Sequence, residues 1–362
     1  VNGADSTSTT PLWIASRQGH LEIVKLLIES GGSVNGADST STTPLYIASQ
    51  EGHLEIVRLL IESGGSVNEA NNHRTTPLHI ASQSGHLGVV KFLIASGGNV
   101  NQADKDGLTP LHVAIREGKL DLIEFLVASG ALVNEANKNG DTPLMLAIEF
   151  DHLEVVESLI LLIIAEDGII DKADNLGNTP LGAAVKKGNL EIVEELVESG
   201  VSGSSVDGES GAKDGIVRSH VHAAVSNGHI EVMKYLIAGG GSVNHPDHEG
   251  MTPLHTASMK GFLDCVKFLI SVGALMNEID NDGRTPLSIA TGKGHLEIVK
   301  ILVEGHADIH YCDAATGKTP LSEAEAGGHI EVIEYLQQEI DPVKYKNKTK
   351  NKNKKKKKKK NK

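Results

Sequence analysis

The sequence predicts an all-α solenoid of about ten helix-turn-helix repeats, followed by a disordered basic tail. Three observations predict it. The tripeptide Thr-Pro-Leu recurs, and its first four steps are each 33 residues long. A second marker, "GHLEIV" or a variant of it, begins nine residues after each of these threonines. Aromatic residues are only 3% of the chain, so a core must be built from Leu, Ile, Val and Ala. One short unit cannot bury its apolar face alone, whereas stacked copies can.

Ten copies of the unit can be counted from their first residues. Nine begin with threonine, and the seventh is degenerate because Ser219 and His220 replace Thr-Pro. The threonines are Thr10, Thr43, Thr76, Thr109, Thr142, Thr179, Thr252, Thr285 and Thr319. We therefore assign residues 1–340 to one repeat domain, with an insert at 203–215, and residues 341–362 to the tail.

The first repeat shows how each unit forms two helices. Thr10 is a good N-cap, and Pro11 suits the first helical position, where a missing N–H costs nothing. Gly19 ends the first helix in the left-handed conformation. A second helix is expected from about Leu21 to Glu29.

The second helix is predicted to be buried on several sides. Its apolar residues cover most of the circumference and leave one exposed stripe, at Glu22, Lys25 and Glu29. The apolar residues are Leu21, Ile23, Val24, Leu26, Leu27 and Ile28.

Several sites depart from the repeat. Thr142 and Thr179 are 37 residues apart, and the four extra residues in "SLILLIIAEDGII" are expected to lengthen the second helix by about one turn. The insert 203–215, rich in Gly, Ser and acid, is expected to be a flexible finger or a weak joint. Asp151 stands in place of the usual glycine after the first helix of the fifth repeat. The turn glycine before Thr-Pro is replaced in the first three repeats by Ser8, Ser41 and Arg74, so we expect those connectors to differ in shape.

The chain resembles the ankyrin repeat family. The family's T-P-L-H-x-A stands here as "TPLHIA" at 76–81, "TPLHVA" at 109–114 and "TPLHTA" at 252–257. The resemblance covers residues 1 to about 340. It implies antiparallel helix pairs joined by projecting β-turn fingers, a concave groove, and a function in binding proteins.

The first two repeats indicate where a partner binds. Residues 1–33 and 34–66 differ only at Trp13/Tyr46, Arg17/Gln50, Gln18/Glu51 and Lys25/Arg58. The resemblance implies that the end of the first helix faces the groove, and Arg17 is expected to stack on Trp13. The candidate partner-binding residues are Trp13, Arg17, Gln18, Tyr46, Gln50, Glu51, Gln83, Ser84, Arg116, Glu117, Glu149, Phe150, Lys186 and Lys187. Drift at tolerant surface positions is the alternative explanation.

Three other features of the sequence could carry chemistry. "CDAATGKT" (312–319) looks like the end of a phosphate-binding loop, but the first glycine is missing and Pro320 follows at once. His306, Asp308, His310 and Cys312 alternate and are zinc-capable types, although the segment is in register with ordinary connectors. Recurring histidines are expected to cap helices or to hydrogen-bond between repeats. We predict no enzymatic activity, no metal, no cofactor and no small-molecule substrate.

The charge of −13 hides a split between body and tail. Residues 343–362 hold 13 lysines and no acid, which leaves 21 basic against 47 acidic residues, a net of −26, for the rest. Most acids fall on the second helices, where they favour solubility. The tail is compositionally disordered. It is a minor candidate for binding nucleic acid or an anionic membrane surface, and A-rich codons are the alternative origin of its composition.

Two cysteines, with no signal peptide and no apolar run long enough to span a membrane, indicate a cytoplasmic protein, with the nucleus as the alternative. We expect a monomer that serves as a protein-interaction module or scaffold. The alternative is a targeting or adaptor segment of a larger signalling, channel or ubiquitin-ligase protein, truncated before Val1, because the chain does not begin with Met.

Overall fold

The computed structural model describes residues 1–166, 168–200 and 219–341. The insert 203–215 and the lysine-rich tail lie outside the described residues, so the predictions for them stay predictions. The chain divides into two compact units, Val1–Ala183 and Ala184–Lys362. The division falls inside the helix α11.

The described residues form twenty α-helices in ten pairs, joined by turns and loops, and contain no strand. The first unit holds α1 (Pro11–Arg17), α2 (Leu21–Glu29), α3 (Pro44–Glu51), α4 (Leu54–Glu62), α5 (Pro77–Ser84), α6 (Leu87–Ala95), α7 (Pro110–Arg116), α8 (Leu120–Ala128), α9 (Pro143–Glu149) and α10 (Leu153–Ala165). Both units share α11 (Pro180–Lys187), and the second unit continues with α12 (Leu190–Glu198), α13 (His220–Asn227), α14 (Ile230–Ala238), α15 (Pro253–Lys260), α16 (Leu263–Ser271), α17 (Pro286–Lys293), α18 (Leu296–Glu304), α19 (Pro320–Gly327) and α20 (Ile330–Ile340).

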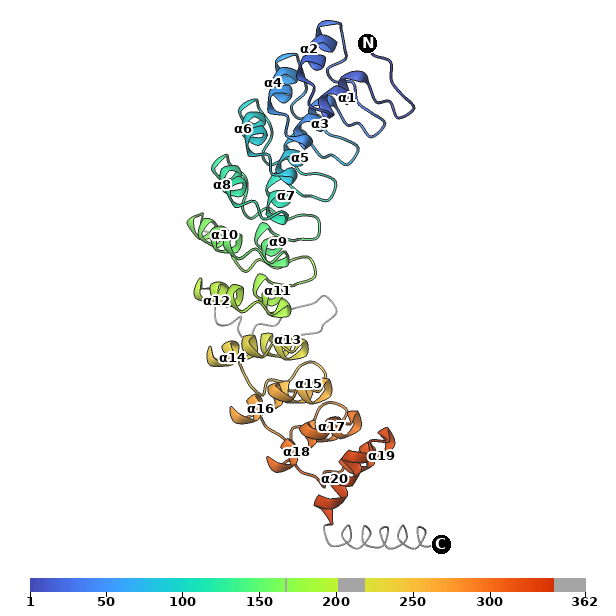
Figure 1. Ribbon diagram of the computed structural model, residues 1–362. Helices are drawn as coiled ribbons and strands as arrows, with labels where there is room; N and C mark the ends of the chain where they lie inside the picture. Colours follow the sequence, from blue (N-terminus) through green and yellow to red (C-terminus); the bar gives the residue numbers. More distant parts are fainter. Residues whose placement is uncertain (167, 201–218, 342–362) are drawn as a thin grey trace, which may run out of the picture. The chain divides into compact units, whose positions relative to one another are not determined.

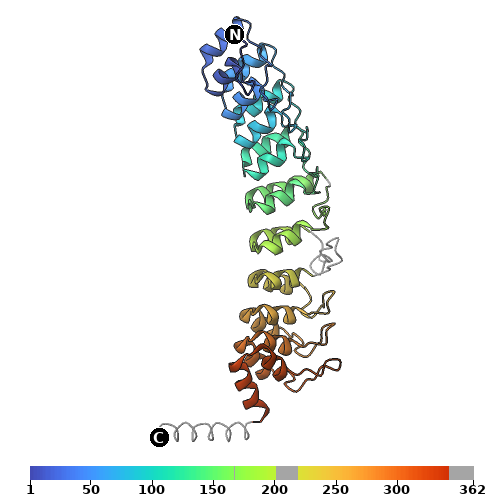
Figure 2. The same ribbon diagram turned by 90° about the vertical axis from the view of Figure 1, so that its right-hand side faces the viewer.

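Within the first unit, the first helices of successive pairs pack against one another, and the second helices form a parallel row behind them (Figure 1). The finger loops project from the side of the first helices. In the second unit, α13, α15, α17 and α19 are likewise neighbours in series, each paired with its own second helix (Figure 2). The predicted all-α repeat architecture is confirmed.

The helix ends follow the sequence signals. The hydroxyl of Thr43 accepts a hydrogen bond from the Tyr46 N–H at 3.2 Å, and Pro44 occupies the first helical position. Gly52 ends α3 in the left-handed region, with φ of 79°. In the fifth repeat, α10 has 13 residues where the second helices of the first four repeats have nine, so the predicted extra turn is confirmed.

The expectation that the first three fingers differ in shape is wrong. Ser8, Ser41 and Arg74 have φ of 62°, 64° and 62°, in the same left-handed region as Gly107 at 81°. The backbone bonds also correspond, because the N–H of Arg74 donates to Asn71 O and that of Gly107 to Asp104 O. The closing bonds of the finger therefore hold side-chain-bearing residues in a conformation that glycine adopts without strain.

Asparagine side chains tie the connector that precedes each helix pair to the end of the second helix of that pair. Asn35 donates to Gly64 O at 3.0 Å, and its own oxygen accepts from the Ser66 N–H at 2.9 Å. Asn2, Asn68 and Asn101 make the same pair of bonds one repeat away. These bonds satisfy backbone groups at the end of each second helix, which would otherwise lack a partner in the helix.

The core is the seam between the two helix rows. Leu45 and Ala48 of α3 are fully buried, as are Val57 and Leu60 of α4. In α2, the prediction of burial on several sides is wrong. Ile23 is 49% exposed, whereas its counterpart Ile56 is 2% exposed, and Leu26 is 62% exposed. The reason is that, within the row of second helices, α2 has a described neighbour on one side only, which is α4.

This difference predicts unequal mutational effects at equivalent positions. Leu60→Ala removes a fully buried side chain from α4, the helix that lies between α2 and α6. It should lower the free energy of unfolding by about 2–5 kcal/mol. Leu27→Ala, at the half-buried counterpart, should cost less than about half as much. Urea denaturation followed by circular dichroism measures both. Equal losses would show that α2 is packed as tightly as α4.

The strained finger residue predicts a stabilising substitution. Arg74→Gly should raise the free energy of unfolding by roughly 0.5–1 kcal/mol, because glycine adopts positive φ without a steric penalty. The matched control makes the opposite change in another finger. At Gly317, φ is 68° and a Cβ would meet nothing within 4 Å, so Gly317→Ser introduces a side chain without a clash. It should cost a similar amount through backbone strain alone. A destabilised Arg74→Gly variant would mean that the arginine side chain stabilises its finger.

Candidate functional site

The candidate partner-binding residues lie at the ends of the first helices. In the first unit these helices pack in series, so their ends form one row. We call it the helix-end row: Arg17, Gln18, Gln50, Glu51, Gln83, Ser84, Arg116, Glu117, Glu149 and Phe150. Trp13 and Tyr46 lie one turn earlier on α1 and α3. Lys186 and Lys187 end α11, at the start of the second unit.

Most of the row is accessible to a partner. Gln50 and Gln83 are half-buried, and the other eight residues of the helix-end row are exposed, as are Lys186 and Lys187. Tyr46 differs, since it is only 8% exposed, and burial raises the pKa of its phenol to about 12. Its ring is therefore part of the buried interior rather than of an open surface.

Histidines of the following repeat fix the backbone beneath the row. The Nε2–H of His53 donates to Arg17 O at 3.1 Å, and that of His86 donates to Gln50 O at 2.9 Å. His152 reaches Arg116 O at 3.3 Å, and in the second unit His229 reaches Lys186 O at 3.0 Å. The backbone of each such residue is held by its neighbour, while its side chain projects from the helix end.

The turn glycine makes room for each histidine. A Cβ on Gly52 would lie 2.6 Å from the ring of His86, and one on Gly19 would lie 2.7 Å from that of His53. Both glycines also have positive φ. Asp151 occupies this place in the fifth repeat, and the following repeat has Asn189 where histidine would stand. The oxygen of Asn189 accepts from the Ile192 N–H and so caps its own helix.

The predicted contact between Trp13 and Arg17 is confirmed. The Arg17 guanidinium lies over the indole ring, 5.7 Å from its centroid. Trp13 itself is half-buried, and its Nε1 is buried without a hydrogen-bond partner in the described residues. The stacked pair presents an aromatic ring and a cation at one end of the row.

A second set of histidines, those of Thr-Pro-Leu-His, acts inside the lattice. The Nδ1 of His79 accepts from the Thr76 N–H at 3.2 Å, while its Nε2–H donates to Leu108 O of the next finger at 3.0 Å. His112 accepts in the same way from the Thr109 N–H at 3.1 Å. Burial lowers the pKa of His79 and of His255, and lowers that of His112 to about 4. The predicted structural role of the recurring histidines is confirmed.

The structure explains the phosphate-loop likeness of 312–319. The Asp313 carboxylate accepts from the N–H groups of Ala315 and Thr316 at 2.8 and 2.5 Å. These are amides that a phosphate would need, and the protein's own carboxylate already occupies them. The zinc-capable residues His306 to Cys312 lie on a segment that turns at 305–306 and again at 309–310. Among the described residues, no three His, Cys, Asp or Glu side chains gather as metal ligands would.

The comparisons identify the family. A family model described as ankyrin repeats (3 copies) matches residues 1–71, 66–137, 130–207, 208–280 and 272–346. The chain therefore belongs to the ankyrin repeat family, whose members are generally protein–protein interaction modules. No curated protein matches the chain. Within the described ranges, every helix is too short or too polar to cross a membrane.

The buried histidines predict destabilisation by acid. An unfolded histidine titrates near pH 6.5, so between about pH 6.5 and 4 the unfolded chain takes up a proton that folded His112 does not. Stability should therefore be lost as the pH falls through this window, by about 2 kcal/mol from His112 alone between pH 7 and 5. Urea denaturation at the two pH values measures the loss.

The matched variant is His112→Ser, because Ser288 occupies this position naturally and its hydroxyl accepts from the Thr285 N–H at 2.8 Å. The variant should be less stable at pH 7, yet lose less stability on going to pH 5. His20→Ser, at an exposed histidine, should leave the pH dependence as it is. A His112→Ser variant with unchanged pH dependence would show that other groups cause the acid sensitivity.

Proposed function

We propose that this chain binds a protein partner through the helix-end row and the adjoining fingers. One observation carries the proposal. Two of the four differences between the nearly identical repeats fall at Arg17/Gln50 and Gln18/Glu51, on helix ends whose backbone is held by a histidine and whose side chains project outward. Variation at such positions alters a surface without altering the lattice.

The row has mixed chemistry, which suits recognition of a particular protein surface. Arg17 stacks on Trp13, and these two residue types are enriched at binding hot spots. Further along, Arg116 and Glu117 form a loose pair at 3.9 Å, followed by Glu149 and the exposed ring of Phe150. We propose Trp13 and Arg17 as the anchor and the remainder of the row as the selective surface, with Lys186 and Lys187 as contacts contributed by the second unit.

We also propose that the protein works inside the cell. Cys265 and Cys312 are both free thiols, which fits a reducing compartment. A role as an adaptor segment of a larger protein is compatible with the same surface, and the length of the complete gene product decides that question. The proposal is for binding rather than for catalysis.

Replacing Arg17, Gln18, Gln50 and Glu51 together by alanine should weaken binding while stability stays nearly unchanged. Exposed substitutions usually change stability by less than about 0.5 kcal/mol each. The measurement is quantitative affinity capture from cell extract with the intact chain and the quadruple variant, followed by titration of the captured protein. Trp13, the only tryptophan, gives a second readout, since its emission should shift on binding.

The control variant removes four exposed charges from the second helices: Glu22, Lys25, Glu55 and Arg58. It should bind the partner as the original chain does. If the quadruple row variant bound the partner equally well, or if the control lost as much affinity, the partner-binding surface would lie elsewhere.

A further inference from the structure

The outward faces of the second helices carry a recurrent ion pair that α8 and α10 lack. In five of these helices, an acid pairs with a cation three residues later. Examples are Glu22 with Lys25 at 3.3 Å and Glu297 with Lys300 at 2.7 Å, and the others are on α4, α14 and α16. In α8 and α10 the cation is replaced by Glu124 and by Glu157, as it is by Glu194 in α12 and by Glu334 in α20.

These replacements leave uncompensated negative charge. Glu124 follows Asp121 on α8, and Glu157 follows Glu154 on α10, so like charges stand at the spacing where attraction is usual. All four carboxylates are exposed, and within the described residues none of them makes an ion pair. An arrangement that repels itself in the free protein favours a cationic ligand.

The gap between α8 and α10 also lacks a contact that the two preceding gaps in the row have. The guanidinium of Arg58 lies 4.3 Å from the centroid of the Phe92 ring, and Lys91 lies 5.3 Å from that of Phe125, so each gap is covered by a cation over an aromatic ring. The corresponding residues between α8 and α10 are Glu124 and Ser158. Neither side chain can make such a contact.

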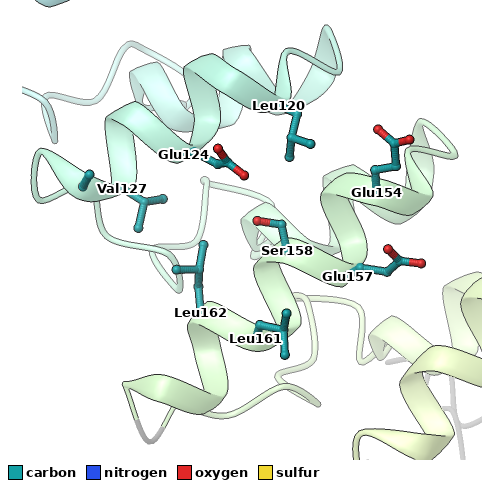
Figure 3. A pocket seen from close by; sticks show the side chains of 9 residues that line it. Leu120, Glu124, Val127, Glu154, Glu157, Ser158, Leu161 and Leu162 are labelled. Carbon is teal, nitrogen blue, oxygen red and sulfur yellow. The ribbon is translucent and has the colours of Figure 1, made fainter.

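A hollow of about 660 Å³ lies between α8 and α10. Figure 3 shows Glu124 and Ser158 facing each other across it, with Leu120 to one side and Val127 and Leu162 to the other. The rim carries Glu154 and Glu157. An apolar floor with carboxylates at its edge is therefore open to solvent.

The extra turn of α10 adds an apolar wall to this hollow. Leu161 is 67% exposed, and the first four repeats have Glu29, Glu62, Ala95 and Ala128 at this position. Leu162 belongs to the four residues by which α10 exceeds its counterparts. Those four repeats show that the fold does not require a large apolar side chain at this position. Contact with a partner would explain why a leucine is exposed here.

We propose that the α8–α10 hollow docks a basic amphipathic helix of a protein partner. Its apolar side chains fill the floor between Leu120, Val127 and Leu162, and its Lys or Arg side chains pair with Glu124 and Glu157. A groove between two helices accepts a third through side chains spaced three or four residues apart. This surface lies on the second-helix row, so it is separate from the helix-end row, and a partner could engage both.

The protein's own tail matches this hollow less well. Residues 343–362 supply lysines, but they contain no Leu, Ile or Phe to cover the apolar floor. The tail would pair with the carboxylates and leave the leucines exposed. A partner helix that has both kinds of side chain matches the whole surface.

A synthetic peptide tests the proposal. The probe is a fluorescein-labelled amphipathic helix of about 14 residues, with Lys and Arg on one face and Leu and Ile on the other. Its binding to the full chain is followed by fluorescence anisotropy at about 0.15 M salt. We expect saturable binding. A peptide of equal charge with Gln in place of Leu and Ile, and a peptide of residues 343–362, should each bind at least about ten-fold more weakly.

Two variants locate the binding. Glu124→Lys with Glu157→Lys should weaken it by about ten-fold or more. This variant restores the acid–cation spacing of the other second helices, so its fold is supported, and a melting curve checks that. The matched control, Glu29→Lys with Glu62→Lys, makes the same charge change on α2 and α4 and should alter affinity by less than about two-fold. Leu161→Ser should reduce affinity without any change of charge.

Each possible result either supports the proposal or overturns it. Absence of saturable binding, or equal losses in the α8–α10 variant and its control, would overturn the proposal. Equal binding of the apolar-free peptide would reduce the surface to a nonspecific acidic patch. Tighter binding of the tail peptide would make the protein's own tail the occupant. The quadruple helix-end variant should bind the probe normally, so a failure here is distinguishable from a failure of the helix-end row.

Discussion

The structure depends on side chains that hydrogen-bond to the backbone of a segment about one repeat length away in the sequence. His86 donates to Gln50 O, Asn35 bridges Gly64 O and the Ser66 N–H, and His79 donates to Leu108 O of the next finger. The bonds to Gln50 O and Gly64 O satisfy carbonyl groups at helix ends that lack a partner within the helix, and the bond to Leu108 O holds the next finger. Helices of seven to nine residues are too short to persist alone in water, so the bonds and the buried seam between neighbours must supply their stability. Repeats are therefore stable only as neighbours.

This arrangement separates the part of the sequence that must be kept from the part that can vary. A histidine that binds a carbonyl oxygen does not depend on which side chain the accepting residue carries. Arg17, Gln50, Arg116 and Lys186 all accept such a bond, although their side chains differ in charge and length. The glycine beside them cannot vary in the same way, because a Cβ there would collide with the histidine ring. Recognition can thus change at the helix ends at little cost in stability, which is the property that a binding scaffold requires.

The fold was predictable from the sequence because its signals are local and repeated. Three signals each predict one structural feature: Thr-Pro predicts a helix start, glycine a helix end, and the four extra residues of α10 an extra turn. The first two recur at the same positions of successive repeats, which strengthens each assignment. What could not be predicted was the effect of neighbours. Ile23 and Ile56 stand in nearly identical local sequence, yet only Ile56 is buried, because α4 has second helices on both sides and α2 has a described one on one side only. Tyr46 was a candidate surface residue beside Gln50, and it is instead buried. Arg74 was expected to change its finger, but the closing hydrogen bonds of that finger impose a positive φ on whatever residue is present.

A departure from the repeat pattern is informative because the equivalent positions of the other repeats show which residue the fold itself requires there. A surface Glu on a helix has no meaning by itself. Glu124 and Glu157 stand where five other second helices place a paired cation, and Ser158 stands where Phe92 and Phe125 receive one. Leu161, an exposed leucine in a position otherwise held by Glu or Ala in the first four repeats, lies on the same hollow. Three kinds of substitution, in charge, aromatic cover and exposed apolar surface, converge between α8 and α10. The charge change alone recurs at Glu194 of α12 and Glu334 of α20. Within the first unit, the three changes occur together only between α8 and α10, and it is this combination that the proposed docking surface accounts for.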